Sequence, residues 1–182
     1  MNNHVFITGK PRVGKTTLIK KLINILEHKY SIAGFYTEEV REGGERIGFD
    51  IHTIGGKMGV LARSKTPPCE YYYRLGKYMV DTTDIESIAV PELYKKVDII
   101  ICDEIGKMEI FSTKFKEAIM YALNEQPFIL ATISNHNIPF IKNIKLRKDT
   151  IVLELTVINR VGFHETVMKE VKRRITEKIR YY

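Results

Sequence analysis

The feature that most constrains this chain is a short stretch near its amino terminus that fits the pattern GxxxxGK[ST]. It reads Gly9-Lys10-Pro11-Arg12-Val13-Gly14-Lys15-Thr16. The apolar run before it, 4–8, is typical of a short buried strand, and the amphipathic run after it, 16–26, predicts a helix. A strand–loop–helix context is what separates a phosphate-binding P-loop from a chance glycine-rich turn. The sequence therefore predicts that the chain binds a nucleoside triphosphate.

The residue types in this loop match the chemistry of phosphate binding. Gly9 and Gly14 let the backbone curl so that successive N–H groups form an anion nest, and the following helix adds its positive amino-terminal end. Lys15 is expected to contact the β- and γ-phosphates, and the Thr16 hydroxyl is expected to coordinate Mg²⁺. Thr17 follows at a position suited to the α-phosphate. We therefore predict that 9–17 is the nucleotide-binding segment.

Arg12 is the unusual member of the loop because glycine is common at this position. Either its side chain points to solvent, or its guanidinium leans over the phosphates. We favour the first interpretation, since long cationic side chains usually extend outward.

A second signal lies in the run 97–104, where an apolar segment ends in the two carboxylates Asp103 and Glu104. Such a run is typical of a central strand buried on both faces, and its carboxyl end faces the ligand in open α/β sheets. Asp103 fits the acid that holds Mg²⁺, and Glu104 fits the group that orients and polarises an attacking water. Two solvated acids at a strand end are the alternative, which the P-loop makes the weaker one. Cys102, inside the run, is interpreted as a small core residue.

Taken together, these motifs resemble those of the thermostable nucleoside-triphosphatase family, which includes the cancer-related nucleoside-triphosphatases. The resemblance covers most of the chain, and its most specific string is Asp103-Glu104-Ile105-Gly106-Lys107-Met108-Glu109. Three positions depart from the family pattern. Arg12 replaces a usual glycine, Lys145 stands where a first arginine is common before Arg147, and Val161 follows Asn159-Arg160 where an acid is usual.

The resemblance implies an α/β fold of the RecA-like P-loop type, with a mostly parallel central sheet flanked by helices. It also implies Mg²⁺-dependent hydrolysis of nucleoside triphosphates, including ATP, GTP, CTP, UTP and TTP, to diphosphate and phosphate. In RecA-like proteins another strand separates the P-loop strand from the strand that carries the acids. We therefore predict that 128–132 lies between 5–8 and 99–103, with 150–155 on the other side of the P-loop strand.

The rest of the chain alternates between elements of both types. Two strand-like runs, 32–40 and 47–54, flank a turn and predict a β-hairpin insert. The segment 64–81, rich in proline and tyrosine, is interpreted as an irregular loop and a candidate lid. Helices are predicted over three further segments, 84–96, 112–124 with Ser112 as its N-cap, and 165–180.

Three more residues are candidates for the site. Arg147 is a candidate for a catalytic arginine that stabilises charge on the transferred phosphate, and its alternative is a solvated surface charge. Arg160 is a candidate for stacking on the base, which would suit broad base specificity; its alternative is a salt bridge at the start of a helix. Thr132, at a strand end, either senses the γ-phosphate or is an ordinary β-branched strand residue.

Composition is consistent with one cytoplasmic domain over 1–182, which we expect to be monomeric. No apolar run in the sequence is long enough to span a bilayer, and Cys69 and Cys102 do not form a disulfide framework. The net charge of +7 suits polyanionic ligands without distinguishing nucleotides from nucleic acid. A basic helix face near the carboxyl terminus makes nucleic acid a possible but not favoured partner. Two alternatives to a hydrolase remain, a P-loop kinase and a nucleic-acid-binding switch ATPase.

Overall fold

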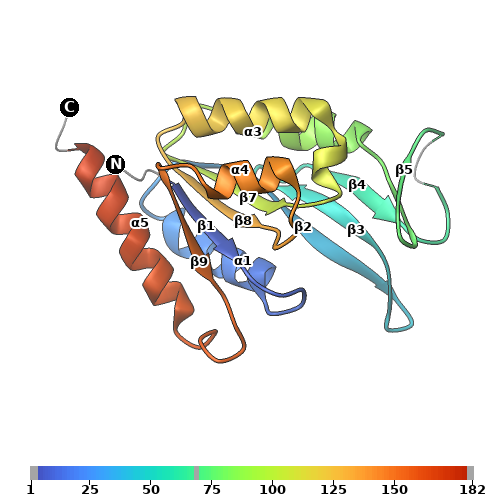
Figure 1. The fold of residues 1–182 in the computed structure, drawn as a ribbon, viewed down its shortest axis with the longest axis horizontal. Helices are drawn as coiled ribbons and strands as arrows, with labels where there is room; N and C mark the ends of the chain where they lie inside the picture. Colours follow the sequence, from blue (N-terminus) through green and yellow to red (C-terminus); the bar gives the residue numbers. More distant parts are fainter. Residues whose placement is uncertain (1–3, 68–69, 180–182) are drawn as a thin grey trace.

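The computed structural model describes residues 4–67 and 70–179, and its central feature is one large β-sheet with helices on both faces (Figure 1). The strands are β1 (His4–Thr8), β2 (Ile32–Glu42), β3 (Glu45–Thr53), β4 (Met58–Arg63), β5 (Tyr73–Leu75), β6 (Tyr78–Val80), β7 (Ile99–Ile105), β8 (Ile129–Ile133) and β9 (Thr150–Glu154). The helices are α1 (Lys15–Leu26), a π-helical turn η1 (Ile85–Ala89) continuing into α2 (Val90–Leu93), a 3₁₀ turn η2 (Glu109–Phe111), α3 (Thr113–Glu125), α4 (Pro139–Lys145) and α5 (Phe163–Ile179). Cys69 and Arg180 lie outside the described residues.

The order of strands in the sheet is β5-β6-β4-β3-β2-β7-β8-β1-β9. β8 lies between β1 and β7, in parallel register with both, so that Leu130 is opposite Val5 on one side and Ile101 on the other. β9 pairs in parallel with the free side of β1. The predicted order of these four strands is therefore confirmed, and β1 does not pair directly with β7 as it would in a kinase-type P-loop protein.

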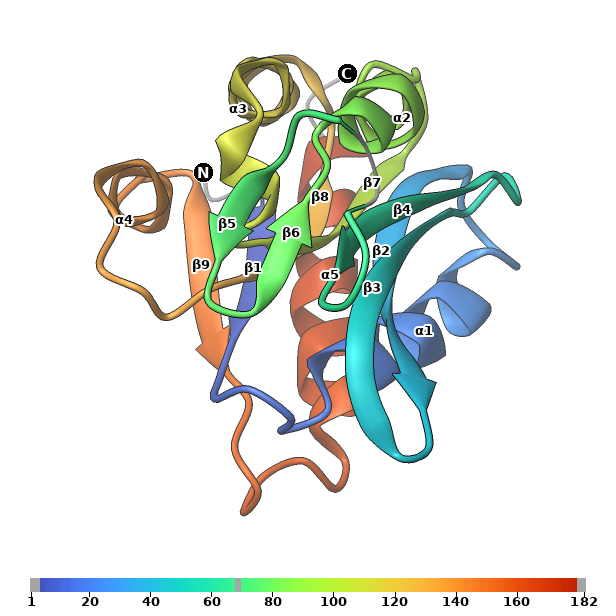
Figure 2. The same cartoon turned by 90° about the vertical axis from the view of Figure 1, so that its right-hand side faces the viewer.

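Helices cover both faces of the parallel part of the sheet, α1 and α5 on one face and α2, α3 and α4 on the other (Figures 1 and 2). Successive side chains of β1 point to opposite faces of the sheet, so this strand contributes to both hydrophobic layers. Val5 and Ile7 point toward α1 and α5, whereas Phe6 points to the opposite layer, and all three are fully buried. Burying each such side chain contributes about 1.5–3 kcal/mol.

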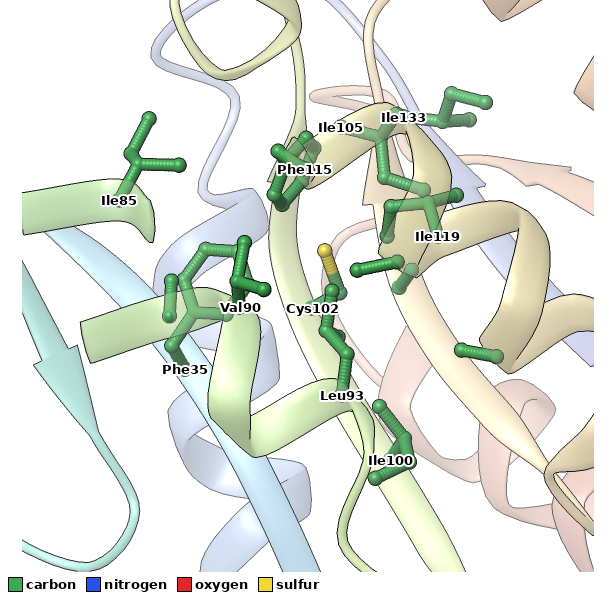
Figure 3. Packing of buried hydrophobic residues seen from close by; sticks show 14 of the residues in the cluster. Phe35, Ile85, Val90, Leu93, Ile100, Cys102, Ile105, Phe115, Ile119 and Ile133 are labelled. Atoms are coloured by element: carbon green, nitrogen blue, oxygen red, sulfur yellow. The ribbon is translucent and has the colours of Figure 1, made fainter. Parts of the chain in front are cut away.

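The hydrophobic layer between the sheet and helices α2 and α3 contains an aromatic contact between a strand and a helix (Figure 3). The rings of Phe35 on β2 and Phe115 on α3 meet edge to face, with 5.9 Å between their centroids. Ser112 caps α3 as predicted, because its side chain accepts a hydrogen bond from the Phe115 N–H at 3.0 Å. Cys102 lies in the same cluster, fully buried, and burial raises the pKa of its thiol. Its interpretation as a core residue is confirmed.

The predicted β-hairpin insert is formed by β2 and β3, which pair in antiparallel register. Their turn lies at Gly43 and Gly44, which have φ angles of 56° and 83°, a region that glycine adopts with little strain. The tip of this hairpin and the loop after β1 extend from the same edge of the sheet (Figure 2).

One sequence prediction about a connecting segment was wrong, and another was right except for its end and its first turn. The segment 64–81 is not one irregular loop, because β5 and β6 form a hairpin within it and β6 pairs with β4. Tyr78, Met79 and Val80 are buried there, so apolar burial adds a short edge to the sheet despite the two prolines earlier in the segment. The helix expected over 84–96 ends at Leu93 and begins as a π-helical turn.

The structure adds the short helix α4, which no sequence pattern had indicated. It begins with Pro139 and fully buries Ile141 and Ile144, and the partly buried Phe140 packs against the same core cluster. Helix α5 extends over the segment expected to be helical at the carboxyl end. Within 4–67 and 70–179, no helix is both long and apolar enough to cross a membrane.

Candidate nucleotide-binding site

The loop between β1 and α1 has a backbone shape that depends on two glycines. Gly9 has a φ angle of 155°, and a Cβ atom there would lie only 2.4 Å from the Leu155 carbonyl oxygen. Gly14 has a φ angle of 107° and caps α1 from the left-handed region. A residue with a side chain would clash at the first position and be strained at both, so the loop shape requires glycine.

Arg12 adopts a left-handed backbone with a φ angle of 65°, which is uncommon for a residue with a side chain. The residue is exposed, and it lies at the mouth of the cavity described below. Its side chain is therefore available both to solvent and to a ligand at the loop.

Lys15, the first residue of α1, has its side chain largely buried at 10 % exposure. Its Nζ donates a hydrogen bond to the Gly9 carbonyl oxygen at 3.3 Å and lies 3.7 Å from Glu104 Oε2. The ammonium is thus held across the loop, between the backbone nest and the end of β7. The contact of Lys15 with the β- and γ-phosphates stays a prediction.

Asp103 lies near the end of β7 and is only 1 % exposed. Burial raises the pKa of its carboxyl to about 6 and the charge of Glu104 adds to this, while interactions with the Thr132 and Thr16 side chains lower it. Thr132 Oγ1 donates to Asp103 Oδ1, but Oδ2 is buried and has no hydrogen-bond partner among the residues that the structure describes. A carboxylate oxygen left in this state beside a threonine hydroxyl fits a hard cation such as Mg²⁺, which prefers oxygen ligands.

Thr132 itself is fully buried in β8. Of the two roles considered for it, contact with the γ-phosphate is not supported, because its hydroxyl is directed to Asp103 and it does not line the cavity. Its hydrogen bond fixes the carboxylate of Asp103 instead.

Glu104 follows Asp103, but its side chain is 30 % exposed. It lines a cavity of about 680 Å³ together with residues of the phosphate-binding loop. The other lining residues are Gly9, Pro11, Arg12, Gly14, Lys15, Thr16, Thr17, Lys20, Thr37, Glu38, Glu39, Arg41, Arg46, Phe49, Ser134, Asn135 and His136. The structure therefore brings a half-buried carboxylate and the loop lysine to one cavity large enough for a nucleotide.

The wall opposite the loop is formed by charged side chains of the β2–β3 hairpin. Glu39 pairs with both Arg41, at 2.6 Å, and Arg46, at 2.8 Å. Arg46 Nε also donates to the Tyr78 hydroxyl at 2.7 Å, which ties the hairpin to β6. A second cavity of about 410 Å³ continues on this side, and it shares Arg12, Arg41 and Arg46 with the first.

Glu38 lies on the same wall, where it forms an ion pair with Lys20 of α1 and lies 3.8 Å from His52 Nε2. The interaction with Lys20 lowers the pKa of Glu38, which keeps this carboxyl ionised. Glu38 and Arg41 do not pair with each other, and both line the cavity.

Glu109 is buried behind the cavity, in the turn after β7. It accepts a hydrogen bond from the Gly106 N–H at 3.1 Å, and burial followed by the charge of Glu104 raises its pKa to about 8. A carboxyl held in this way is protonated at neutral pH.

The structure does not bring Arg147 to this site. Arg147 precedes β9, and its guanidinium pairs with Asp149 at 2.6 Å and donates to Asn124 Oδ1 at 3.1 Å at the end of α3. Asp149 is joined to His4 at the start of β1, so Arg147 lies at the edge of the sheet opposite the loop after Thr8. The sequence prediction erred because it placed Arg147 by its basic neighbours, without the direction of α4.

Arg160 lies on the expected edge of the sheet, in the loop that follows β9. This loop is held by Asn159, whose Nδ2 donates to the Glu154 carbonyl oxygen at 2.9 Å and whose Oδ1 accepts from the Thr156 N–H at 2.8 Å. Arg160 is exposed and does not line the cavity.

The sequence analysis missed Ser134, Asn135 and His136, which follow β8 and line the cavity next to Glu104. A usable signal was present, because polar residues directly after a parallel strand beside the P-loop strand lie at the ligand-binding edge. Burial, together with the charges of Lys107 and Lys145, lowers the pKa of His136, which favours its neutral form.

Comparison with known proteins shows the family of this chain. The family model described as NTPase matches residues 4–172. The chain belongs to the NTPase family. A nucleoside-triphosphatase THEP1 of Thermotoga maritima is 44 % identical over 171 residues, covering 92 % of this chain and 95 % of that protein. The resemblance found in the sequence is thereby confirmed.

Solved structures of this family share the fold. The crystal structure of THEP1 from the hyperthermophile Aquifex aeolicus superposes with a TM-score of 0.80 at 33 % identity, covering 92 % of this chain and 98 % of that one. The solution structure of a human cancer-related nucleoside triphosphatase gives a TM-score of 0.81 at 40 % identity, covering 94 % and 98 %. The predicted α/β P-loop fold is confirmed by these neighbours.

Proposed function

We propose that this NTPase-family member hydrolyses nucleoside triphosphates to diphosphate and phosphate with Mg²⁺ as cofactor. The observation that carries the proposal is the half-buried Glu104 carboxylate, which shares one cavity with the Lys15 ammonium 3.7 Å away. An acid in this position can take a proton from water, whereas a phosphoryl-transfer enzyme needs an acceptor pocket instead.

Each residue has a separate part in this reaction. The loop N–H groups between Gly9 and Thr17 bind the phosphates, and Lys15 neutralises charge on the β- and γ-phosphates. Glu104 orients a water molecule and accepts its proton while the water oxygen bonds to the γ-phosphorus and the bond to the leaving diphosphate oxygen breaks.

Thr16 and Asp103 are the residues that would hold Mg²⁺, and the ion would supply further neutralisation of phosphate charge. The buried Asp103 Oδ2 atom, which lacks a hydrogen-bond partner in the described part of the chain, supports this assignment. The buried Thr132 hydroxyl keeps the other carboxylate oxygen oriented.

Broad base specificity follows if no base edge is recognised by a fixed set of hydrogen bonds. Arg160 is exposed on the loop after β9 and offers a flat guanidinium on which any base can stack. Arg160→Ala should then raise the KM for purine and pyrimidine triphosphates alike, and a loss confined to one base would contradict this role.

The alternatives are less well supported. The position of β8 between β1 and β7 argues against the kinase. On α5, Arg174 is buried and pairs with Glu170 at 2.5 Å, which leaves the exposed basic face smaller than the sequence suggested.

The test is phosphate release from a panel of nucleoside triphosphates, with Mg²⁺ or with EDTA, and with or without RNA and DNA. We expect release with every base, its loss in EDTA, and no response to nucleic acid. Release only in the presence of a nucleoside acceptor would favour the kinase, and strong stimulation by RNA or DNA would favour the switch ATPase.

A further inference from the structure

The second cavity, of about 410 Å³, lies between the β2–β3 hairpin and the turn that joins β5 to β6, and we call it the hairpin cavity. Four cationic side chains line it, and Glu45 is the one carboxylate among its described lining residues. Three of the cations, Arg12, Arg41 and Arg46, line the nucleotide cavity as well, whereas Lys77 lines only the hairpin cavity. The two cavities therefore adjoin, and the hairpin cavity carries an excess of positive charge.

The arginines of the hairpin cavity keep donors that no described protein group uses. Arg46 donates through Nε to the Tyr78 hydroxyl at 2.7 Å and through Nη1 to Glu39 at 2.8 Å, while its Nη2 makes no hydrogen bond within residues 4–67 and 70–179. In the same ranges the Arg12 guanidinium forms neither a hydrogen bond nor an ion pair. A guanidinium presents its donors in a planar fork that fits two phosphate oxygens, so these unused donors suit a phosphate group.

The Tyr78 hydroxyl is a further donor in this cavity. Tyr78 is only 8 % exposed, and its oxygen accepts from Arg46, so its own proton is left without an acceptor in the described part of the chain. Arg46 Cζ and Lys77 Nζ lie 5.5 Å and 5.7 Å from the centre of its ring. A buried hydroxyl donor among cations that it helps to hold fits an anion, because charged acceptors form the stronger hydrogen bonds.

The acidic neighbours do not cancel the charge of the hairpin cavity. Glu39 pairs with both hairpin arginines, and Glu45 pairs with Lys77 at 2.7 Å. Two carboxylates thus stand against four cations, and Arg12 is the cation that has no acidic partner within residues 4–67 and 70–179. The pair of Lys77 with Glu45 is exposed, so solvent screens it and it holds Lys77 only weakly.

The order of strands places the hairpin cavity next to the terminal phosphate rather than next to the base. The loop after β9, which carries Arg160, lies on one side of β1, whereas β7 and then β2 lie on the other. In the proposed function the base lies at Arg160 and the terminal phosphate lies beside Lys15 and Glu104. The phosphate chain then runs from the side of β9 toward β7, and a group in the hairpin cavity lies beyond its terminal phosphate.

We propose that the hairpin cavity is a second phosphate site, which binds a phosphate group beyond the terminal phosphate of a bound nucleoside triphosphate. This group is either a free phosphate ion or the next phosphate of a longer nucleotide chain, as in a nucleoside tetraphosphate. Arg12, Arg46 and the Tyr78 hydroxyl donate to its oxygens, and Lys77 adds positive charge. The inference rests on the proposed function, because that function sets the direction of the triphosphate.

The first arm of the test concerns the longer chain and uses calorimetry in EDTA, so that binding is measured without turnover. We expect the Kd of adenosine tetraphosphate to be about tenfold lower than that of ATP in the parent protein. Lys77→Met should raise the Kd of the tetraphosphate about three- to tenfold, because it removes one charge-assisted contact at a partly exposed position. Lys65→Met is the matched control, since Lys65 pairs with Glu42 of the same hairpin but lines neither cavity, and it should leave the ratio of the two Kd values unchanged.

The second arm removes the unpaired guanidinium through Arg12→Gly. Glycine adopts the φ angle of 65° at this position with little strain, so the loop should keep its shape. The preference for adenosine tetraphosphate over ATP should fall toward onefold. Arg12→Lys, which restores a positive charge, should recover part of this preference.

The third arm concerns the free ion. The protein is saturated with Mg²⁺ and a non-hydrolysable ATP analogue and is then titrated with inorganic phosphate in the calorimeter. We expect saturable binding that Tyr78→Phe weakens about three- to tenfold, the usual cost of one hydrogen bond to a charged group at a partly accessible site. Phosphate binding without a preference for the tetraphosphate supports the free ion as the occupant, and the preference without phosphate binding supports the longer chain.

Two results would overturn the second phosphate site. The first is a parent protein that neither prefers the tetraphosphate nor binds phosphate beside the ATP analogue, and the second is an equal loss in Lys77→Met and Lys65→Met. A parent protein that shows these binding preferences but releases no phosphate from ATP overturns the proposed function alone. A parent protein that hydrolyses ATP without either binding preference overturns this inference alone.

Discussion

The two walls of the nucleotide cavity are built in different ways. On one side, the loop after β1 presents backbone N–H groups in a shape set by Gly9 and Gly14, and one lysine crosses it. On the other side, the β2–β3 hairpin presents the long side chains of Arg41 and Arg46, which Glu39 holds through ion pairs. The first wall consists of consecutive residues, whereas in the second wall Arg46 on β3 reaches Glu39 on β2 only because the two strands pair.

This difference predicts that the loop wall determines whether a triphosphate binds, and that the hairpin wall only modifies its affinity. Backbone donors and a largely buried ammonium act with little reorganisation, so the loop wall should determine whether a triphosphate binds at all. The hairpin arginines are partly exposed and already paired, and screened pairs of this kind contribute little each. Changes on the loop wall should therefore have much larger effects than changes on the hairpin wall.

The largest effect is expected for Lys15→Ala. In the proposed function its ammonium is the main point charge for the β- and γ-phosphates, and charge-assisted contacts contribute about 1.5–3 kcal/mol each. Triphosphate affinity measured by calorimetry should fall on the order of 10- to 100-fold, and turnover should be lost. Lys21→Ala, on the same helix but outside the cavity, is the control. An unchanged triphosphate affinity in Lys15→Ala would contradict the claim that the loop wall contributes more to binding than the hairpin wall.

A second effect concerns Glu109, which is buried in the turn after β7. Its pKa is raised from 4.5 to about 8 in the folded protein, so the folded state keeps a proton that the unfolded chain releases. The stability from this group is fully present below pH 4.5 and is lost as pH rises toward about 8, at about 1.4 kcal/mol per pH unit.

Glu109→Gln should therefore flatten the fall in stability over this pH window. Urea unfolding of the parent and the variant, without nucleotide or Mg²⁺, measures the effect, and at pH 8 the variant should be the more stable of the two. Parallel pH profiles for the two proteins would show that Glu109 is ionised at its ordinary pKa.

On the hairpin wall, Arg46→Ala should raise the KM for triphosphates only about three- to tenfold, with kcat nearly unchanged. Arg46 lines both cavities, but much of its charge is already used by Glu39. Arg74→Ala, on the exposed strand β5, provides the comparison and should leave KM as it is. A fall in kcat as large as that of Lys15→Ala would mean that the hairpin takes part in the chemistry.

The smallest kinetic effect is expected for Arg147→Ala, because its guanidinium lies at the opposite edge of the sheet. Steady-state rates should match the parent. The melting temperature should fall about 2–4 °C, since the pair with Asp149 and the bond to Asn124 contribute about 1 kcal/mol. A fall in kcat without a change in melting temperature would return Arg147 to the active site.

The loop wall was predictable from sequence because its function lies in neighbouring residues and in the backbone. The strand–loop–helix segment around Gly9–Lys15 and the acids at the end of β7 were found for this reason, whereas the position of β8 between β1 and β7 was predicted from the topology that the family resemblance implies. A motif of this kind needs no knowledge of distant contacts.

The remaining parts depend on contacts between residues far apart in the chain. Lys145 reaches Asn135 only because of the direction of α4, a helix of 7 residues that is too short to show a clear periodic pattern. For the same reason Arg147 was assigned to the wrong edge of the sheet. The β5–β6 hairpin was missed because its strands are only three residues long and follow a proline-rich segment.

The central claim, that Glu104 makes this site a hydrolase, is tested most directly by Glu104→Gln. The substitution keeps size and hydrogen bonding but removes the ability to accept a proton, while Asp103 and Thr16 are left in place. We predict a fall in kcat on the order of 10²–10⁴-fold with the Kd of a non-hydrolysable triphosphate within twofold of the parent. Phosphate release at the parent rate would contradict the account and transfer the search for the base to the other carboxylates at the cavity, Glu38 first.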